Sequence, residues 1–250
     1  TEGWRTASLV VAIFAASVIP IFLIFFKNSP EEVGILPYGG DHKDGAGGAA
    51  PKTARGTISV LFLAAKKPAF WILAGTFFVC GWTTNGLIGA HFIPAAHDHG
   101  MPEGTAAGLL AVVGIFDFVG TILSGWLTDR VNPIILLVFY YGLRGLALFT
   151  VPFVLGPQVE PPLLFFIVFY GLDWIATVPP TIELCRRYFG RAQSPSVYGW
   201  VFASHMVGAG ISAWVAGFVR DTTGTYDLAW WSAGVLCLLA AAASWLVPRG

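Results

Sequence analysis

Seven long apolar stretches constrain this chain more than any other feature of its sequence. Each has about twenty or more residues, the length that a helix needs to cross a bilayer core about 30 Å thick. Because lipid offers the backbone no hydrogen-bond partners, such a segment must be helical rather than an open strand. We therefore predict an all-α integral membrane protein with about seven transmembrane helices, at residues 6–26, 69–94, 105–127, 133–155, 162–184, 197–219 and 228–247.

The composition agrees with this and argues against other classes of protein. Hydrophobic residues make up 56% of the chain and charged residues 11%, against about 25% charged in an ordinary soluble domain. The formal net charge is zero, so no nucleic-acid partner is expected. Cys80, Cys185 and Cys237 lie in or beside apolar stretches without the spacing of metal ligands, so neither a disulfide framework, a metal nor a cofactor is expected.

One connection differs from the short turns between the other stretches. Residues 28–67 are polar and contain a flexible Gly- and Ala-rich run at 45–51. At the end of this segment, Ile58, Leu61, Phe62 and Ala65 share one helical face. This spacing predicts a short helix that lies along the membrane surface.

The positive charges predict the orientation. Counted over alternate loops, eleven Lys and Arg residues fall on the side of the long connection, and only Arg5 and Arg220 fall on the other. Lys and Arg accumulate on the cytoplasmic side of membrane proteins, so the long connection and the C-terminus are both expected to be cytoplasmic. The chain begins at Thr1 rather than methionine, and its first apolar stretch exceeds the roughly 7–15 residues of a signal-peptide core. We therefore expect the polypeptide to be incomplete at its N-terminus.

A motif after the third stretch resembles a known family. Gly125-Trp126-Leu127-Thr128-Asp129-Arg130 resembles the Gly-x-Leu-x-Asp-Arg loop of the major facilitator superfamily, which lies between the second and third helices and is echoed between the eighth and ninth. Residues 131–133 differ from the residues that usually follow this loop in the family. Residues 28–39 and 205–226 are similar to the central linker and to the eleventh helix and its loop in monocarboxylate-type and oxalate/formate-type members.

The resemblance implies that the chain is a C-terminal half, from helix six to helix twelve. Residues 1–27 would end an incomplete N-terminal bundle, 28–67 would be the cytoplasmic linker, and 68–250 would form a C-terminal six-helix bundle. It implies a missing N-terminal six-helix bundle as partner and alternating access around a site near the bilayer midplane. Gly125, Asp129 and Arg130 would then control the conformational equilibrium. The expected location is the cell (inner or plasma) membrane, as a multi-pass protein.

Three ionisable side chains stand deep in predicted helices, where a charge costs roughly 2.5–3.5 kcal/mol. We expect Arg144 to attract an anionic substrate, and Asp117 or Asp173 to take up a coupling proton, since a desolvated carboxyl group is protonated more readily. An interhelical Asp/Arg pair without substrate contact is the alternative. In animal monocarboxylate carriers an arginine follows the matching eighth-helix aspartate by four residues. This chain has Thr121 there, so Arg144 would have to substitute.

Three further residues complete the predicted substrate site. Asn85 lies in a polar segment within the second stretch, and Trp174 is next to Asp173. His205 lies inside the sixth stretch, where it could bind substrate, carry a proton or simply pack against neighbouring helices. Consecutive prolines at 179–180 predict a bend in the fifth helix, because they remove backbone hydrogen bonds.

Together these features indicate a secondary active transporter in the lipid bilayer and not an enzyme. Its expected substrate is a small molecule, a small organic anion such as a monocarboxylate, moved by proton symport or anion exchange. The alternatives are a carrier for neutral solutes or drugs and a seven-helix receptor. A retinal protein is excluded because all five lysines lie in or beside the long connection. An enzyme is disfavoured because no nucleophile motif, zinc-binding His-Glu-x-x-His helix or suitably paired acids are present.

Overall fold

The computed structural model describes residues 3–27, 33–35 and 54–248, and every regular element among them is helical. Most of the predicted linker, including nearly all of the segment 28–39, lies outside the described residues. The helices are α1 (Trp4–Phe25), α2 (Ala54–Ala64), α3 (Pro68–Gly81), the π-helix η3 (Trp82–Ile88), α4 (Gly89–Asp98), α5 (Glu103–Thr128), α6 (Pro133–Val154), α7 (Pro161–Asp173), α8 (Val178–Thr223) and α9 (Asp227–Trp245).

The chain divides into two units, residues 1–48 and 49–250. The division falls inside the segment predicted as a linker. In the first unit α1 carries Pro20 in its interior, and its side chains from Arg5 to Phe25 are all exposed. A helix that is apolar on every side suits a hydrocarbon environment rather than water.

The prediction of an all-α membrane fold is confirmed. Six helical ranges of the described residues are long and apolar enough to cross a membrane, and five of them match predicted stretches one to one. The remaining range, Pro161–Thr223, has 63 residues and covers two predicted stretches. It comprises α7 and α8, and α8 is interrupted at Gly190, whose φ of 76° is not helical. All seven predicted stretches therefore coincide with helices.

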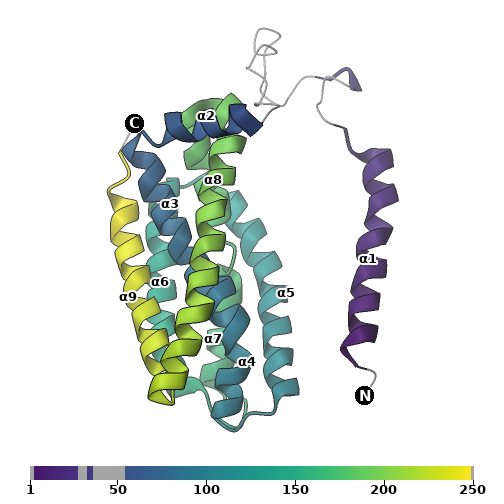
Figure 1. Ribbon diagram of the computed structural model, residues 1–250, viewed down its shortest axis with the longest axis vertical. Coiled ribbons are helices and arrows are strands. Elements are labelled where there is room, and N and C mark those ends of the chain that lie inside the picture. Colours follow the sequence, from purple (N-terminus) through teal and green to yellow (C-terminus); the bar gives the residue numbers. More distant parts are fainter. Residues whose placement is uncertain (1–2, 28–32, 36–53, 249–250) are drawn as a thin grey trace. The chain divides into compact units, whose positions relative to one another are not determined.

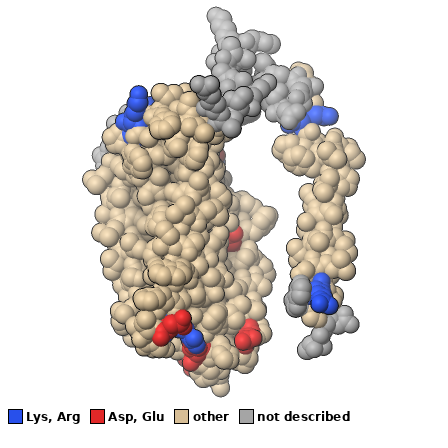
Figure 2. Space-filling model, in the orientation of Figure 1, with Lys and Arg blue, Asp and Glu red and all other residues tan. Residues whose placement is uncertain are grey.

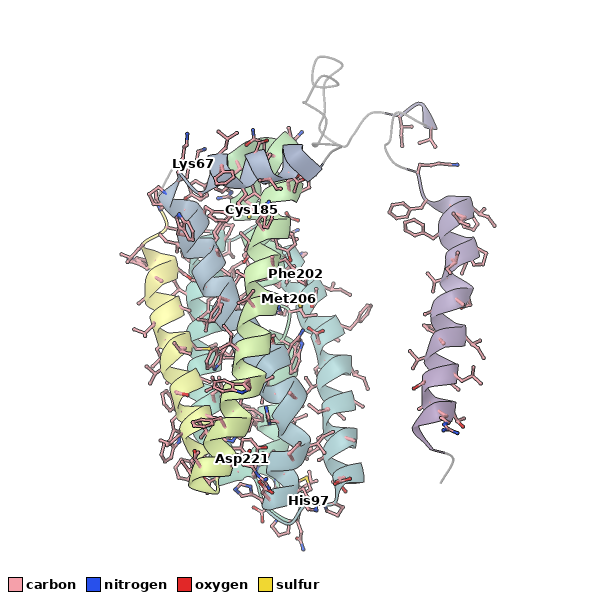
Figure 3. The ribbon with its side chains drawn as sticks, in the orientation of Figure 1. Lys67, His97, Cys185, Phe202, Met206 and Asp221 are labelled. Atoms are coloured by element: carbon pink, nitrogen blue, oxygen red, sulfur yellow. The ribbon has the colours of Figure 1, made fainter. Side chains whose placement is uncertain are left out.

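In the second unit, α3 to α9 form a bundle with α2 lying across one end (Figure 1). Lys67 and Cys185 lie toward the end that carries α2, whereas His97 and Asp221 lie at the opposite end (Figure 3). The visible flank of the bundle is largely uncharged, and its charged atoms gather toward the two ends (Figure 2). This distribution is typical of a protein whose flank faces lipid.

The second predicted stretch is a composite of α3, η3 and α4. In η3 the backbone bonds from residue i to i+5, as in the bond from the Gly89 amide to the Thr84 carbonyl. Short π-helices inside α-helices are frequent at functional sites. The polar segment around Asn85 therefore has an irregular backbone within an otherwise continuous span.

Proline and asparagine determine where several helices begin. Proline occupies the first turn of α3, α6, α7 and α8, where its missing N–H group is not needed. The side chain of Asn132 accepts a hydrogen bond from the Ile134 amide at 3.0 Å and thereby caps α6. At its other end α8 stops at Gly224, whose φ of 81° is the left-handed conformation typical of a helix terminus.

Glycine brings three pairs of helices close together: α3 and η3 with α8, α5 with α7, and α6 with α9. A Cβ atom on Gly208 of α8 would overlap the carbonyl oxygen of Phe78, and one on Gly120 of α5 would overlap the backbone of α7. Between α6 and α9, a Cβ atom on Gly145 would lie 2.9 Å from the carbonyl oxygen of Gly234. Close backbone approach of this kind is how membrane helices gain packing energy without a hydrophobic driving force.

The surface helix predicted near residues 57–67 is present as α2. Its Val60 and Ala64 are buried against the bundle, and the indole of Trp200 on α8 donates to the Thr57 carbonyl at 3.1 Å. Ile58 and Phe62 on the other side of the helix are 48% and 67% exposed. One face of α2 therefore packs on α8 and the other is free for the membrane surface.

The glycine contacts predict a position-dependent effect of substitution on α8. Gly208→Val forces α8 away from α3 and should reduce the free energy of unfolding by at least about 1–3 kcal/mol. Gly210→Val is the matched control, because a Cβ atom there meets nothing within 4 Å. Thermal midpoints in detergent should fall clearly for Gly208→Val alone, and equal midpoints for the two variants would contradict the close packing.

Candidate functional site

A helix break between α7 and α8 organises the polar interior of the bundle. α7 ends at Asp173, residues 174–177 form turns, and α8 starts at Val178. Pro179 and Pro180 have no N–H group, so the carbonyl groups before them lack their normal helical partners. The bend predicted from the two prolines is thus present as a full interruption just before them. Because water is absent from the hydrocarbon, side chains must satisfy the released backbone groups.

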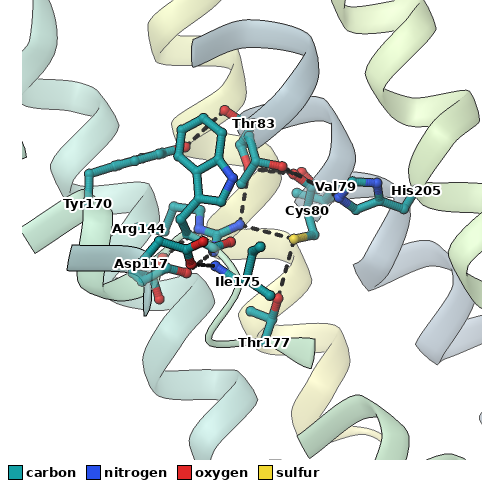
Figure 4. A network of polar contacts seen from close by, with 12 residues as sticks. Val79, Cys80, Thr83, Asp117, Arg144, Tyr170, Ile175, Thr177 and His205 are labelled. Atoms are coloured by element: carbon teal, nitrogen blue, oxygen red, sulfur yellow. Dashed lines mark hydrogen bonds and ion pairs between the residues drawn. The ribbon is translucent and has the colours of Figure 1, made fainter. Parts of the chain in front are cut away.

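Arg144 of α6 satisfies one side of this break. Its side chain is completely buried, and its Nε donates to the Asp173 carboxylate at 2.5 Å. Its Nη2 donates to the carbonyl groups of Asp173 and Trp174, and its Nη1 contacts the Cys80 sulfur at 3.3 Å and the Thr83 hydroxyl at 3.4 Å (Figure 4). All five guanidinium N–H groups are therefore engaged.

Residues of α5 hold the other side of the break. The Asp117 carboxylate accepts hydrogen bonds from the Ile175 amide at 3.0 Å and from the Thr121 hydroxyl at 3.3 Å. Ser124 donates to the Ala176 carbonyl at 2.5 Å, which is one of the groups left without a partner by the prolines. The four residues of the break are thus bound from both sides by side chains of neighbouring helices.

The charges of this cluster do not balance. Arg144 and Asp173 form an ion pair in which the two side chains are 0% and 6% exposed. Asp117, half-buried on α5, adds a second carboxylate without a second cation, so the cluster carries one excess negative charge when both acids are ionised. One oxygen of Asp173 also lacks a hydrogen-bond partner within the described structure. Buried and unbalanced charges of this kind mark the cluster as a candidate functional site.

The π-helix η3 is the third element that contributes to this polar cluster. Tyr170 of α7 donates to the Thr83 carbonyl at 2.9 Å, and Thr83 in turn donates to the carbonyl groups of Val79 and Cys80. Thr84 also donates to the Cys80 carbonyl, at 2.7 Å. These bonds connect the irregular backbone of η3 with α7 and with the end of α3.

Two cavities adjoin the cluster. The larger, of about 280 Å³, is lined by Asp117, Trp174 and apolar residues of α4 and α5. The smaller, of about 110 Å³, is lined by Asn85, Trp174 and His205 together with Cys80 and apolar side chains. His205 is buried, its ring stacks on Phe202, and its Nε2 lies 3.5 Å from the Thr84 hydroxyl. The structure thus brings all six residues of the predicted substrate and proton sites into one region.

The residues of the Gly-x-Leu-x-Asp-Arg resemblance lie at the far end of α5. Arg130 folds back onto its own helix, where its guanidinium lies 4.2 Å from the centre of the Trp126 ring and donates to the Trp126 carbonyl. Asp129 is exposed and makes no side-chain hydrogen bond or ion pair to another described residue. A Cβ atom on Gly125 would meet nothing within 4 Å. Within this bundle these three residues bind no neighbouring helix.

The sequence reasoning missed several residues that hold the cluster together. Cys80 of α3 and Thr83 of η3 contact Arg144 of α6. Tyr170 of α7 donates to Thr83, and Ser124 of α5 donates to the break. In the sequence, Pro179 and Pro180 indicate that the helix is disturbed near the break. No pattern in the sequence, however, indicates which distant hydroxyl or amide meets a released backbone group.

Comparison with known proteins identifies the family. Residues 2–185 match the family model described as Major Facilitator Superfamily. The chain belongs to the major facilitator superfamily. This agrees with the Gly125–Arg130 motif and with the helix-bundle fold.

Relatives of this superfamily member include named transporters. Monocarboxylate transporter 12-B of Danio rerio is 31% identical over 174 residues, which are 67% of this chain and 35% of that protein. The uncharacterized MFS-type transporter YcxA of Bacillus subtilis (strain 168) is 25% identical over 230 residues, which are 90% of this chain and 52% of that protein. The chain thus spans about half the length of these relatives or less.

A solved structure supports the fold of this superfamily member. The fucose:proton symporter of E. coli aligns with a TM-score of 0.65 over 96% of this chain and 54% of that one, at 19% identity. At this level of identity the likeness shows the helical arrangement alone.

The buried ion pair predicts a non-additive response to substitution. Arg144→Gln or Asp173→Asn alone leaves a buried charge without its partner and should destabilise the protein by about 3–5 kcal/mol. The double variant leaves neither charge and should regain a large part of that loss. Thermal midpoints of the four proteins in detergent measure this coupling. A double variant as unstable as the sum of the two single variants would contradict it.

Proposed function

We propose that this chain is part of a secondary active transporter for a small organic anion such as a monocarboxylate. The observation that carries the proposal is the membrane-embedded group of Arg144, Asp173 and Asp117 around an interrupted helix. An intramembrane cation next to a carboxylate in excess combines attraction for an anion with a place for a proton. The similarity to proteins named monocarboxylate transporters supports the substrate class.

The proposed architecture follows the family. Residues 1–27 would be the last helix of an N-terminal bundle, 28–67 the cytoplasmic linker and 68–250 the C-terminal bundle. A further six-helix bundle would complete the transporter, and the two bundles would rock about the region of the break. The protein would then be a multi-pass protein of the cell or plasma membrane with a cytoplasmic C-terminus.

Asp117 is the better candidate for proton coupling, because Asp173 already balances Arg144. The Asp117 carboxylate accepts the Ile175 amide and the Thr121 hydroxyl and lines the larger cavity. Protonation removes the charge from this acceptor and weakens both hydrogen bonds. Proton uptake at Asp117 would therefore loosen the break between α7 and α8. Asp173 would take part indirectly, by setting how firmly Arg144 is held.

Substrate binding by Arg144 requires an exchange of partners. Its five N–H groups are engaged, so a substrate carboxylate would replace one of them, most simply the neutral contacts with Cys80 and Thr83. Asn85, Trp174 and His205 line the adjoining smaller cavity and would surround the rest of a small substrate. The cavity of about 110 Å³ favours a compact anion.

Gly125, Asp129 and Arg130 would set the balance between inward-open and outward-open states. Asp129 is exposed, and the space beside Gly125 is empty. Both features leave room for a segment of the other bundle to approach in one of the two states. Arg130, held against Trp126, would then lie at the same interface.

Transport itself tests the proposal. The product of the complete reading frame, reconstituted in proteoliposomes, should take up labelled small monocarboxylates, and an inward proton gradient should increase the uptake. A panel of neutral sugars is the control. If the protein took up sugars but no carboxylate, it would be a carrier for neutral solutes rather than for organic anions.

Asp117→Asn separates coupling from binding. Asparagine keeps an oxygen that accepts the Ile175 amide but takes up no proton, so the fold should survive. We expect proton-driven accumulation to fall at least about tenfold, equivalent to about 1.4 kcal/mol, while exchange of labelled for unlabelled substrate continues. Thr121→Val removes the neighbouring hydroxyl but leaves the carboxyl group, and should keep accumulation. Full accumulation by Asp117→Asn would show that a residue other than Asp117 takes up the coupled proton.

A further inference from the structure

Cys80 is buried beside the proposed binding site, and its sulfur has polar neighbours that packing alone does not require. Its sulfur lies 3.3 Å from a guanidinium nitrogen of Arg144 and 3.3 Å from the hydroxyl of Thr177 in the helix break (Figure 4). The residue is 1% exposed, and yet it lines the cavity of about 110 Å³. The thiol therefore stands between α6, the break and an internal space large enough for a small group.

A second feature marks this cavity as a place for a polar ligand. The imidazole of His205 points from α8 toward Cys80 (Figure 4) and lines the same cavity. His205 is only 7% exposed, and its Nδ1 atom has no hydrogen-bond partner in the described structure. A buried ring nitrogen without a partner is rare, and it favours a ligand that enters the cavity.

We propose that Cys80 is a site of reversible covalent modification by small disulfides and related thiol-reactive compounds, and that the modification stops transport. The inference rests on the proposed transport function for its consequence, but not for the chemistry of the thiol. The guanidinium of Arg144 favours the thiolate, which is the nucleophilic form of cysteine.

The disulfide itself is the oxidant, so the reaction needs no other redox partner. The Cys80 thiolate attacks one sulfur of a small disulfide, a new S–S bond forms to Cys80, and the other half leaves as a thiolate. With a thiosulfonate the leaving group is a sulfinate. A reducing thiol reverses the reaction by the same exchange.

Modification would stop transport because the Cys80 sulfur contacts both Arg144 and the helix break. A group added to the Cys80 sulfur fills the cavity beside His205 and displaces the Nη1 atom of Arg144 and the hydroxyl of Thr177. The break between α7 and α8 is then held in one position by the added group. Substrate and modifying reagent also compete for the same space, so bound substrate should slow the reaction.

The other two cysteines provide internal controls. Cys185 and Cys237 are buried, and neither lines this cavity. No hydrogen bond from the guanidinium of Arg144 reaches either sulfur among the described contacts. They should react far more slowly than Cys80.

The experiment uses methyl methanethiosulfonate on the reconstituted product of the complete reading frame. Modification is measured at each cysteine by peptide mass spectrometry, and uptake is measured before and after treatment. Each protein is compared with its own untreated sample: wild type, Cys80→Ser, and a Cys185→Ala/Cys237→Ala double variant. We expect wild type and the double variant to gain one methylthio group on Cys80 and to lose at least about tenfold in uptake, equivalent to about 1.4 kcal/mol. A reducing thiol should restore the uptake, and Cys80→Ser should not respond to the reagent.

The two proposals fail in different ways. No modification at Cys80, or modification at Cys80 with unchanged uptake, would overturn the thiol site. Loss of uptake in Cys80→Ser on treatment would also overturn it. Absence of uptake before any treatment would instead contradict the transport function, and the mass measurement alone would then decide whether Cys80 is the reactive thiol.

Discussion

The requirement that every backbone polar group in the hydrocarbon find a partner governs the interior of this protein. An uninterrupted helix meets the requirement by itself, but α7 and α8 are separated by four residues that do not. Arg144, Asp117 and Ser124 satisfy the released carbonyl and amide groups. The position of α5 and α6 against the break therefore depends on these hydrogen bonds as much as on packing.

This arrangement connects ionisation with helix geometry. The Asp117 carboxylate, which is the proposed proton site, also accepts the Ile175 amide, so a change in its charge would act directly on the backbone. The Arg144 guanidinium, which is the proposed anion site, also donates to the carbonyl groups of Asp173 and Trp174. A change of charge at either residue would therefore alter the hydrogen bonds that hold the break.

Glycine packing provides the rigid frame around this adjustable region. Gly208, Gly120 and Gly145 bring their helices together in pairs with backbones in close contact. Pairs held in this way move as units, because separating them would remove their dispersion contacts. η3 is packed against α8 at Gly86, and Tyr170 of α7, near the start of the break, donates to the Thr83 carbonyl of η3. Rigid pairs around a pliable polar centre suit the rocking motion proposed for the transporter.

The sequence by itself determined the elements of this protein and the class of fold. Hydrophobic length predicted all seven spans, because the thickness of a bilayer leaves a helix little freedom. The prolines at 179–180 predicted a bend near the place where the structure has an interruption, because they lack N–H groups. The sequence also identified Arg144, Asp117 and Asp173 as deep charges and offered an Arg/Asp pair as one of two interpretations, since an unpaired charge is costly in lipid. Only the tertiary structure decided that the partner is Asp173, that Asp117 caps the break, and that Cys80 contacts the guanidinium. Those pairings depend on the rotation and height of each helix, which are set by side-chain contacts between segments far apart in the chain rather than by any local pattern.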